Sequence, residues 1–143
     1  MSYETVEAGL QTEIRATATL EDEQVSLGDW LILGYGHAQV AVLEYQSFTA
    51  ERDSSDVDTM ITWTVRINLL VKYTDDADGT NLLRDIRDEI LTRLLKNPKL
   101  NNTAFDSMPI QGSIAGEDEE VVIGGVRFLK EWIDVEIEER VNA

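Results

Sequence analysis

The feature of this sequence that most constrains its fold is an unbroken alternation in residues 60–73, MITWTVRINLLVKY. Every odd position, from Ile61 to Tyr73, is apolar, whereas the even positions are mostly polar. Successive side chains of a β-strand point to opposite faces, so this pattern predicts a strand with one face toward a core. The other face is expected to meet water or another chain.

The predicted strand is long for a chain of 143 residues. Its 14 residues span roughly 45 Å at ~3.3 Å per residue, whereas a compact globule of this size is about 35 to 40 Å across. Part of the strand should therefore project beyond the rest of the domain. Residues 60–64, together with the acidic segment before them, are predicted to project as a β-hairpin.

The composition indicates how many domains the chain forms and in which environment it folds. A hydrophobic content of 43% supplies one real core, so residues 1–143 are predicted to form a single domain. No apolar run approaches the ~20 residues that span a bilayer, and we expect no membrane anchor and a cytoplasmic site of synthesis. The chain has no cysteine, which excludes disulfides and thiolate metal sites.

Acidic residues dominate the charge, with 28 Asp and Glu against 12 Lys and Arg and a net charge of −16. The net charge is the same in both halves of the chain. Residues 1–72 have 12 acidic and four basic residues, and residues 73–143 have 16 acidic and eight basic residues, so each half has a net charge of −8. Such a surface with few lysines resembles proteins of salt-loving cells, where salt screens self-repulsion. The alternative is an ordinary acidic cytoplasmic protein. Either origin disfavours non-specific binding to nucleic acid through a basic surface.

The rest of the chain predicts two helices and several further strands. Apolar residues at helical spacing predict two helices. The first is capped by Ser2 and ends near residues 16–19, and the second is capped by Thr80 or Asp78 and is ended by Asn97-Pro98. Strands are predicted at 38–48, 105–111, 121–123 and 126–139, with a tight turn at Gly124-Gly125. The polar segment 49–59 is predicted to be a long exposed loop. The expected fold is α+β, a mainly antiparallel β-sheet with two α-helices packed on one face and a long β-hairpin.

Catalytic and metal-binding patterns are weak. His37 is the only histidine, and GYGHAQ lacks the third glycine of a dinucleotide-binding loop. Residues 74–79 are similar to the start of a calcium loop, but Thr74 and Asp85 occupy two positions that need other ligands. We therefore predict no enzyme activity, no cofactor and no metal. Six aspartates are instead candidates for acidic loops or for the wall of a channel: Asp53, Asp56, Asp58, Asp75, Asp76 and Asp78.

The even positions of the long strand are candidates for an interface with another subunit or a tube. Aromatic residues on a solvent face indicate interface anchors, and Trp132 can occupy such a face, whereas Trp63 falls on the apolar side. The interface candidates are Met60, Thr62, Thr64, Arg66 and Trp132. If an open edge at this hairpin pairs with a neighbouring subunit, proline at Thr62 or Thr64 should impair assembly more than secondary structure.

The N-terminal third resembles the opening of tail-terminator and neck proteins of long-tailed viruses. The resemblance consists of a helix beginning SYETVE followed by a Val-x-x-Gly-Asp-aromatic turn. The residues that carry it are Tyr3, Val6, Leu10, Val25, Gly28, Asp29 and Trp30. The later long strand, acidic turn, helix and final strand agree with the same layout.

This resemblance implies a virion protein of the tail or neck, assembled in the host cytoplasm. It implies a homo-oligomeric ring, typically of six copies, at the head-proximal end of the tail tube. The ring ends tube polymerisation and contacts both the tail tube protein and the head-side connector. Acidic walls would let genomic DNA pass without sticking. With the composition, the resemblance favours a haloarchaeal tailed virus.

Two other functions stay open from the sequence. A head-closure or adaptor protein of the same neck also forms rings. An acidic inhibitor that mimics DNA would instead form a small dimer and bind a basic partner.

Overall fold

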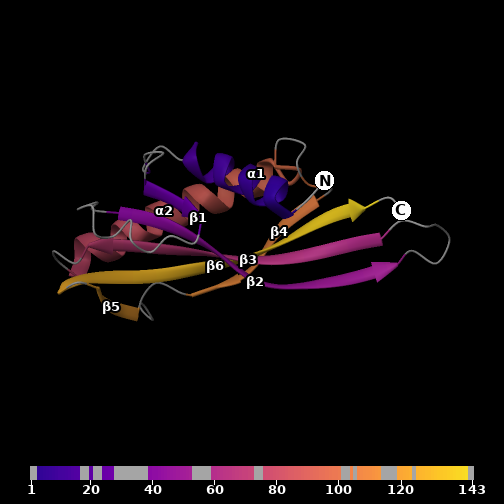
Figure 1. Ribbon diagram of the computed structural model, residues 1–143. Helices are drawn as coiled ribbons and strands as arrows, with labels where there is room; N and C mark the ends of the chain where they lie inside the picture. The colour runs from indigo at the N-terminus through magenta and orange to yellow at the C-terminus, as the bar shows by residue number, and fades with distance from the viewer. Residues whose placement is uncertain are drawn as a thin grey trace.

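The computed structural model describes residues 3–16, 20, 24–27, 39–52, 59–72, 76–100, 104, 106–113, 119–123 and 125–141 (Figure 1). The elements are α1 (Tyr3–Arg15), β1 (Val25–Leu27), β2 (Gln39–Arg52), β3 (Thr59–Lys72), α2 (Asp76–Lys96), β4 (Asp106–Gly112), β5 (Glu119–Ile123) and β6 (Val126–Val141).

The described strands form one sheet in the order β1-β2-β3-β6-β4, and β5 also pairs with β6. β1 lies parallel to β2, and the other described pairs are antiparallel. β4 and β5 share one edge of the long strand β6, since β4 pairs with residues 133–138 and β5 with residues 126–130. The two helices lie on one face of this sheet (Figure 1), so the predicted α+β fold is confirmed.

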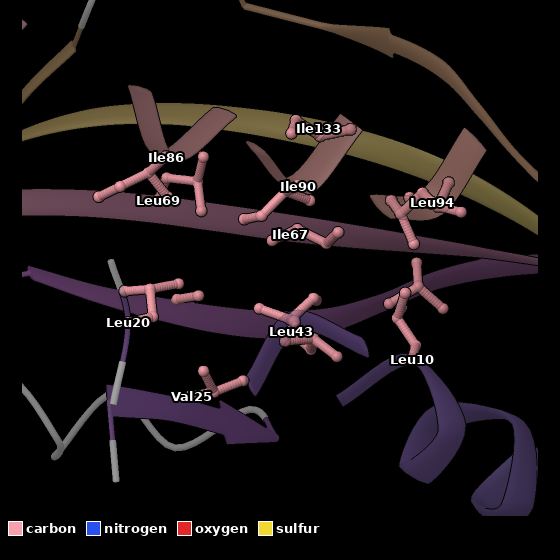
Figure 2. Close-up of a cluster of buried hydrophobic side chains, with 14 of the residues drawn as sticks. Leu10, Leu20, Val25, Leu43, Ile67, Leu69, Ile86, Ile90, Leu94 and Ile133 are labelled. Atoms are coloured by element: carbon pink, nitrogen blue, oxygen red, sulfur yellow. The ribbon is translucent and has the colours of Figure 1, made fainter. Parts of the chain in front are cut away.

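The main core fills the space between the helices and the sheet. We call this side of the sheet the helix face and the opposite side the outer face. α1 and α2 bury apolar side chains at steps of three and four residues, the spacing of one helix stripe. Figure 2 shows the α2 stripe above β3 and β6. The two stripes consist of Val6, Leu10, Ile14, Leu83, Ile86, Ile90 and Leu94, each at most 1% exposed.

The long strand β3 has two parts with different burial. The odd positions from Val65 to Val71 belong to the main core, so the predicted inward face is confirmed. Residues 59–64 are only half-buried, and Figure 1 shows the strands continuing past the helices on the right. We call the continuing part the arm, consisting of residues 44–52 of β2, 59–64 of β3 and 136–141 of β6. The predicted long β-hairpin is therefore confirmed.

The prediction of a loop at residues 49–59 is wrong for residues 49–52 and 59, which belong to strands, whereas residues 53–58 lie outside the described residues. β2 continues to Arg52, β3 begins at Thr59, and these two residues are partners across the hairpin. Cross-strand backbone pairing holds residues 49–52 and 59 extended although they are mostly polar, because backbone hydrogen bonds do not depend on apolar side chains. The pairing register shifts between Tyr45 and Ser47, which places Tyr45, Phe48 and Ala50 all on the helix face.

The outer face has a small apolar cluster of its own. Val40, Val42, Leu70 and Phe128 are each at most 2% exposed. Leu70 is one of the two apolar residues at an even position in MITWTVRINLLVKY, and its burial explains why the alternation is broken there. The sheet is therefore buried on both faces at this end, away from the arm.

Candidate assembly surface

An aromatic cluster lies on the helix face of the arm. The Trp63 ring contacts the rings of Tyr45 and Phe48, with centroid distances of 5.8 and 5.4 Å. The Trp63 Nε1–H donates a hydrogen bond to Glu139 Oε2 at 2.9 Å, which ties β3 to β6. Tyr45 and Phe48 nevertheless remain 46% and 55% exposed. Half-exposed aromatic rings held in place by a third ring are suited to contact a partner.

The strand that carries Tyr45 and Phe48 also has an open edge. β1 pairs only with Ala41–Leu43 of β2, so no described strand covers the outer edge of residues 44–52. Residues 45–50, YQSFTA, carry no charge in a chain that is 28% charged. Natural proteins usually protect open strand edges with charged residues. An uncharged open edge beside exposed aromatic rings therefore indicates a surface for assembly.

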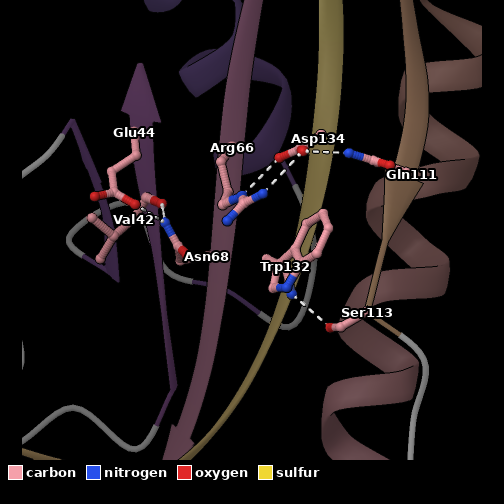
Figure 3. Close-up of polar contacts among 8 residues, drawn as sticks. All are labelled: Val42, Glu44, Arg66, Asn68, Gln111, Ser113, Trp132 and Asp134. Carbon is pink, nitrogen blue, oxygen red and sulfur yellow. Dashed lines mark hydrogen bonds and ion pairs between the residues drawn. The ribbon is translucent and has the colours of Figure 1, made fainter. Parts of the chain in front are cut away.

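A polar network joins three strands at the base of the arm (Figure 3). The Arg66 guanidinium donates two hydrogen bonds to the Asp134 carboxylate, at 2.8 and 3.2 Å. Gln111 Nε2 donates to the same carboxylate at 3.1 Å, and Arg66 Cζ lies 3.9 Å from the Trp132 ring centroid. Because the partners come from β3, β6 and β4, the network holds these strands together where the core ends.

Two further contacts hold the strands beside this network. Asn68 Nδ2 donates to the Val42 carbonyl at 3.2 Å and to Glu44 Oε1 at 2.9 Å, linking β3 to β2. The backbone N–H of Trp132 donates to Ser113 Oγ at 2.9 Å, and the Ser113 N–H donates back to the Trp132 carbonyl at 3.0 Å. These bonds connect β2 to β3 and the end of β4 to β6 at the base of the arm.

A groove of 390 Å³ runs between α2 and β4 on the helix face. Its lining includes Leu91 and Ile133 from the body and the β4 residues Pro109 and Ile110. Arg87 lies at one side, where its Nη1 is 3.1 Å from Oε1 of the fully buried Glu131. The groove is thus mainly apolar with a fixed cation at its border, and it can accept an apolar side chain.

The five predicted interface residues share one surface. Met60, Thr62, Thr64, Arg66 and Trp132 all lie on the outer face, since β3 pairs its even positions with even positions of β6. However, β3 is paired on both sides, so the open edge of the hairpin belongs to β2 and proline at Thr62 or Thr64 would break a central strand. Arg66 and Trp132 contact each other and thereby support the arm.

The acidic candidates are only in part described. Asp53, Asp56, Asp58 and Asp75 lie outside the described residues, as does His37. The backbone of Asp76 and Asp78 belongs to the first turn of α2, so the prediction of a loop at these two residues is wrong. Acidic residues are favoured at a helix N-terminus, where the helix dipole is positive.

Five residues of this surface were not predicted from the sequence, namely Tyr45, Phe48, Ile110, Arg87 and its buried partner Glu131. A signal for the aromatic residues is present, because both fall within the uncharged run at 45–50. The ion pair has no such signal, because its partners are 44 residues apart and meet only through packing.

The described part of the chain shows neither a metal centre nor a membrane-spanning helix. Within the described ranges, no cluster of His, Asp or Glu is arranged to hold a metal ion. No helix among the described residues is long and apolar enough to cross a membrane. No protein-family model matches the chain, and no curated protein matches it significantly. Its function therefore has to be inferred from the chemistry of the described surfaces.

Proposed function

We propose that this chain is a structural virion protein that forms a ring, of about six copies, at the head-proximal end of a viral tail tube. In this role it ends tube polymerisation and joins the tail to the head-side connector. The protein acts by assembly and needs no cofactor. The proposal combines the resemblance of the N-terminal third with the surface described above.

The observation that carries the proposal is the arm with its open β2 edge. Tyr45 and Phe48 are exposed there, although the surrounding chain is strongly acidic. A monomeric protein gains no stability from leaving two aromatic rings half-exposed beside a strand edge that no described strand covers. A subunit of a larger assembly does gain, because the edge and the rings are covered when the next subunit binds.

The charge of the arm agrees with a passage for DNA. Its outer face carries Glu44, Glu51, Glu136 and Glu138 against the single cation Arg140, counting only the described residues. A wall of carboxylates repels phosphate and lets a genome slide through without binding. The net charge of −16 also supports a halophilic source, because concentrated salt screens the repulsion between subunits.

The proposal is tested with the purified chain in about 1 M KCl, where the Debye length falls to ~3 Å. Native mass spectrometry and electron microscopy should show closed rings. Added to polymerising tail tube protein of the same virus, the rings should bind tube ends and limit tube length. Serum albumin at equal mass is the control for crowding.

Other outcomes separate the alternatives. A stable monomer that leaves tube length unchanged contradicts the proposal. Rings that bind the head-side connector and ignore tubes indicate a head-closure or adaptor protein. A small dimer that binds a basic enzyme of nucleic-acid metabolism indicates a DNA mimic.

A further inference from the structure

We propose that the groove between α2 and β4 of one copy receives Tyr45 and Phe48 from the β2 edge of a second copy. This inference rests on the proposed function, because it names the contact by which the ring would form. The contact is heterologous, so each copy uses its β2 edge on one side and its α2–β4 groove on the other. Such a contact closes into a ring when the rotation between copies allows it.

The strand directions favour this pairing of edges. β2 is antiparallel to β3, β3 to β6, and β6 to β4. Consequently, β2 and β4 run in opposite directions within one copy. If two copies stand side by side with their helix faces on the same side, the β4 of one lies antiparallel to the β2 of the next. The sheet then continues between subunits in the antiparallel order that most of its strands have inside each one.

The two surfaces also lie on the same face of the sheet. Tyr45 and Phe48 contact Trp63, which packs against the main core on the helix face. The groove opens on this face too, because α2 contributes Leu91 to its lining. In a continued sheet the two aromatic rings of one copy therefore stand directly beside the groove of its neighbour. The apolar lining and the volume of 390 Å³ suit an aromatic side chain.

Exposed apolar residues concentrate at these two edges. The described part exposes seven large hydrophobic side chains. Four of them lie on the two strands of the proposed contact, namely Tyr45 and Phe48 on β2 and Ile110 and Met108 on β4, with Met108 on the outer face. A fifth, Leu95, follows the groove residue Leu91 by one turn of α2. An aromatic side chain buries about 150–250 Å² when fully covered. Tyr45 and Phe48 are each about half exposed, so a partner could bury a further ~200 Å² of their surface. That is about a quarter of the ~800 Å² that a standard interface buries on each partner.

The charges near the two edges are compatible with contact between identical acidic chains. Residues 107–113 of the β4 edge, SMPIQGS, carry no charge, like residues 45–50 of the β2 edge. Depletion of charge is typical of the centre of an interface. Two copies with a net charge of −16 each can therefore approach at these edges with less repulsion than elsewhere.

Pro109 limits how the edges can pair. Proline has no N–H, and the pairing of β4 with β6 also shifts between Pro109 and Gln111. An uninterrupted ladder with the neighbour is thus excluded, and the aromatic side chains must set the register. This arrangement protects the β4 edge from unspecific strand addition while leaving it open to one partner.

The absence of native cysteine allows a direct test by crosslinking. With Phe48 opposite Pro109, Thr49 of one copy stands beside Met108 of the next, and both residues are exposed. A mixture of Thr49→Cys and Met108→Cys should give a crosslinked heterodimer with a short bismaleimide reagent in about 1 M KCl. The double variant should give a ladder that ends at the ring size. Each single variant alone should remain uncrosslinked.

Substitutions provide a second readout. Phe48→Ser should raise the concentration needed for half-assembly by about tenfold, the typical effect of truncating an anchor residue. Leu91→Trp should do the same by filling the groove. Val122→Ser removes an equally exposed apolar side chain on β5 and should leave assembly unchanged. Circular dichroism shows whether each variant is folded. If Phe48→Ser does not fold, the effect of Leu91→Trp on assembly provides the test.

Distinct results overturn the inference and the proposed function. A Thr49→Cys homodimer would show that β2 pairs with its own copy, and rings without any crosslink between positions 49 and 108 would place the contact elsewhere. Either result overturns the inference and leaves the ring in place. A complete ladder from a protein that does not bind tube ends supports the inference and contradicts the tail-terminator role.

Discussion

The same three strands behave differently in the body of the sheet and in the arm. In the body, the odd positions of β3 from Val65 to Val71 are almost fully buried under the helices. In the arm, Ile61 and Trp63 continue the same alternation but are only half-buried. The difference shows that alternation determines which face a side chain occupies, whereas a covering layer determines whether it is buried.

The two regions also use different side chains. The body is packed with aliphatic residues and buries carboxylates that are paired with arginines, such as Glu131 against Arg87 of α2. The helix face of the arm adds aromatic residues to the aliphatic Ile61 and Ile137, with Trp63 held by a hydrogen bond to Glu139. Aliphatic packing gives stability to the folded chain, while exposed aromatic rings are poised to gain contacts from a partner. Stability is thus expected to reside in the body and assembly in the arm.

The largest difference should come from matched truncations in β3. Ile67→Ala removes a fully buried side chain and should lower the free energy of unfolding by about 3–4 kcal/mol, because it leaves a cavity. Ile61→Ala removes the same atoms from the arm and should lower it by about 1 kcal/mol, since the side chain is already half-exposed. Urea unfolding at high salt measures both values. Equal losses would mean that the arm is as tightly packed as the body.

A close backbone approach links β4 to the body. A Cβ at Gly112 would lie 2.6 Å from the Trp132 carbonyl oxygen, so Gly112→Ala should displace β4 from β6 and destabilise by about 2 kcal/mol. Gly125→Ala is the control, because its φ of 80° makes alanine unfavourable by about 1 kcal/mol without touching β4. Hydrogen exchange at β4 amides should increase only in Gly112→Ala. Unchanged exchange there would contradict the close approach.

The network at the base of the arm should have an intermediate effect. Asp134→Asn weakens two charge-assisted hydrogen bonds with Arg66 and should lower the free energy of unfolding by about 1.5 kcal/mol. Glu136→Gln changes an exposed carboxylate on the same face of β6 and should alter stability by less than about 0.5 kcal/mol. Thermal unfolding of the two variants distinguishes these effects. If Asp134→Asn leaves the free energy of unfolding unchanged, the network does not stabilise the arm.

The smallest effect on stability is expected at the aromatic rings of the arm. Phe48→Ser loses one ring contact with Trp63 and should lower the free energy of unfolding by about 0.5–1 kcal/mol. The same variant should have the strongest effect on assembly. A loss of more than about 2 kcal/mol would show that Phe48 contributes mainly to the stability of the folded chain and would contradict its role as an assembly residue.

The class of fold could be predicted from the sequence, but the assembly surface could not. The helical stripes through Leu10 and Ile86 were predictable because α1 and α2 each bury a single stripe against the sheet. The strand pairing within the polar segment 49–59 was not, because backbone pairing across a hairpin leaves little trace in composition. The sequence also does not predict which strand has the open edge, because a central strand and an edge strand can have the same alternating pattern.

Local patterns alone fix the faces of MITWTVRINLLVKY, the positions of the helix stripes and the uncharged runs at 45–50 and 107–113. These properties depend on periodicity and composition over a few residues. The assembled sheet adds that β3 is central, that residues 44–52 of β2 and the strand β4 have an edge that no described strand covers, and that Arg66 contacts Asp134. Strand order brings together residues far apart in the chain, and no short-range pattern encodes that order.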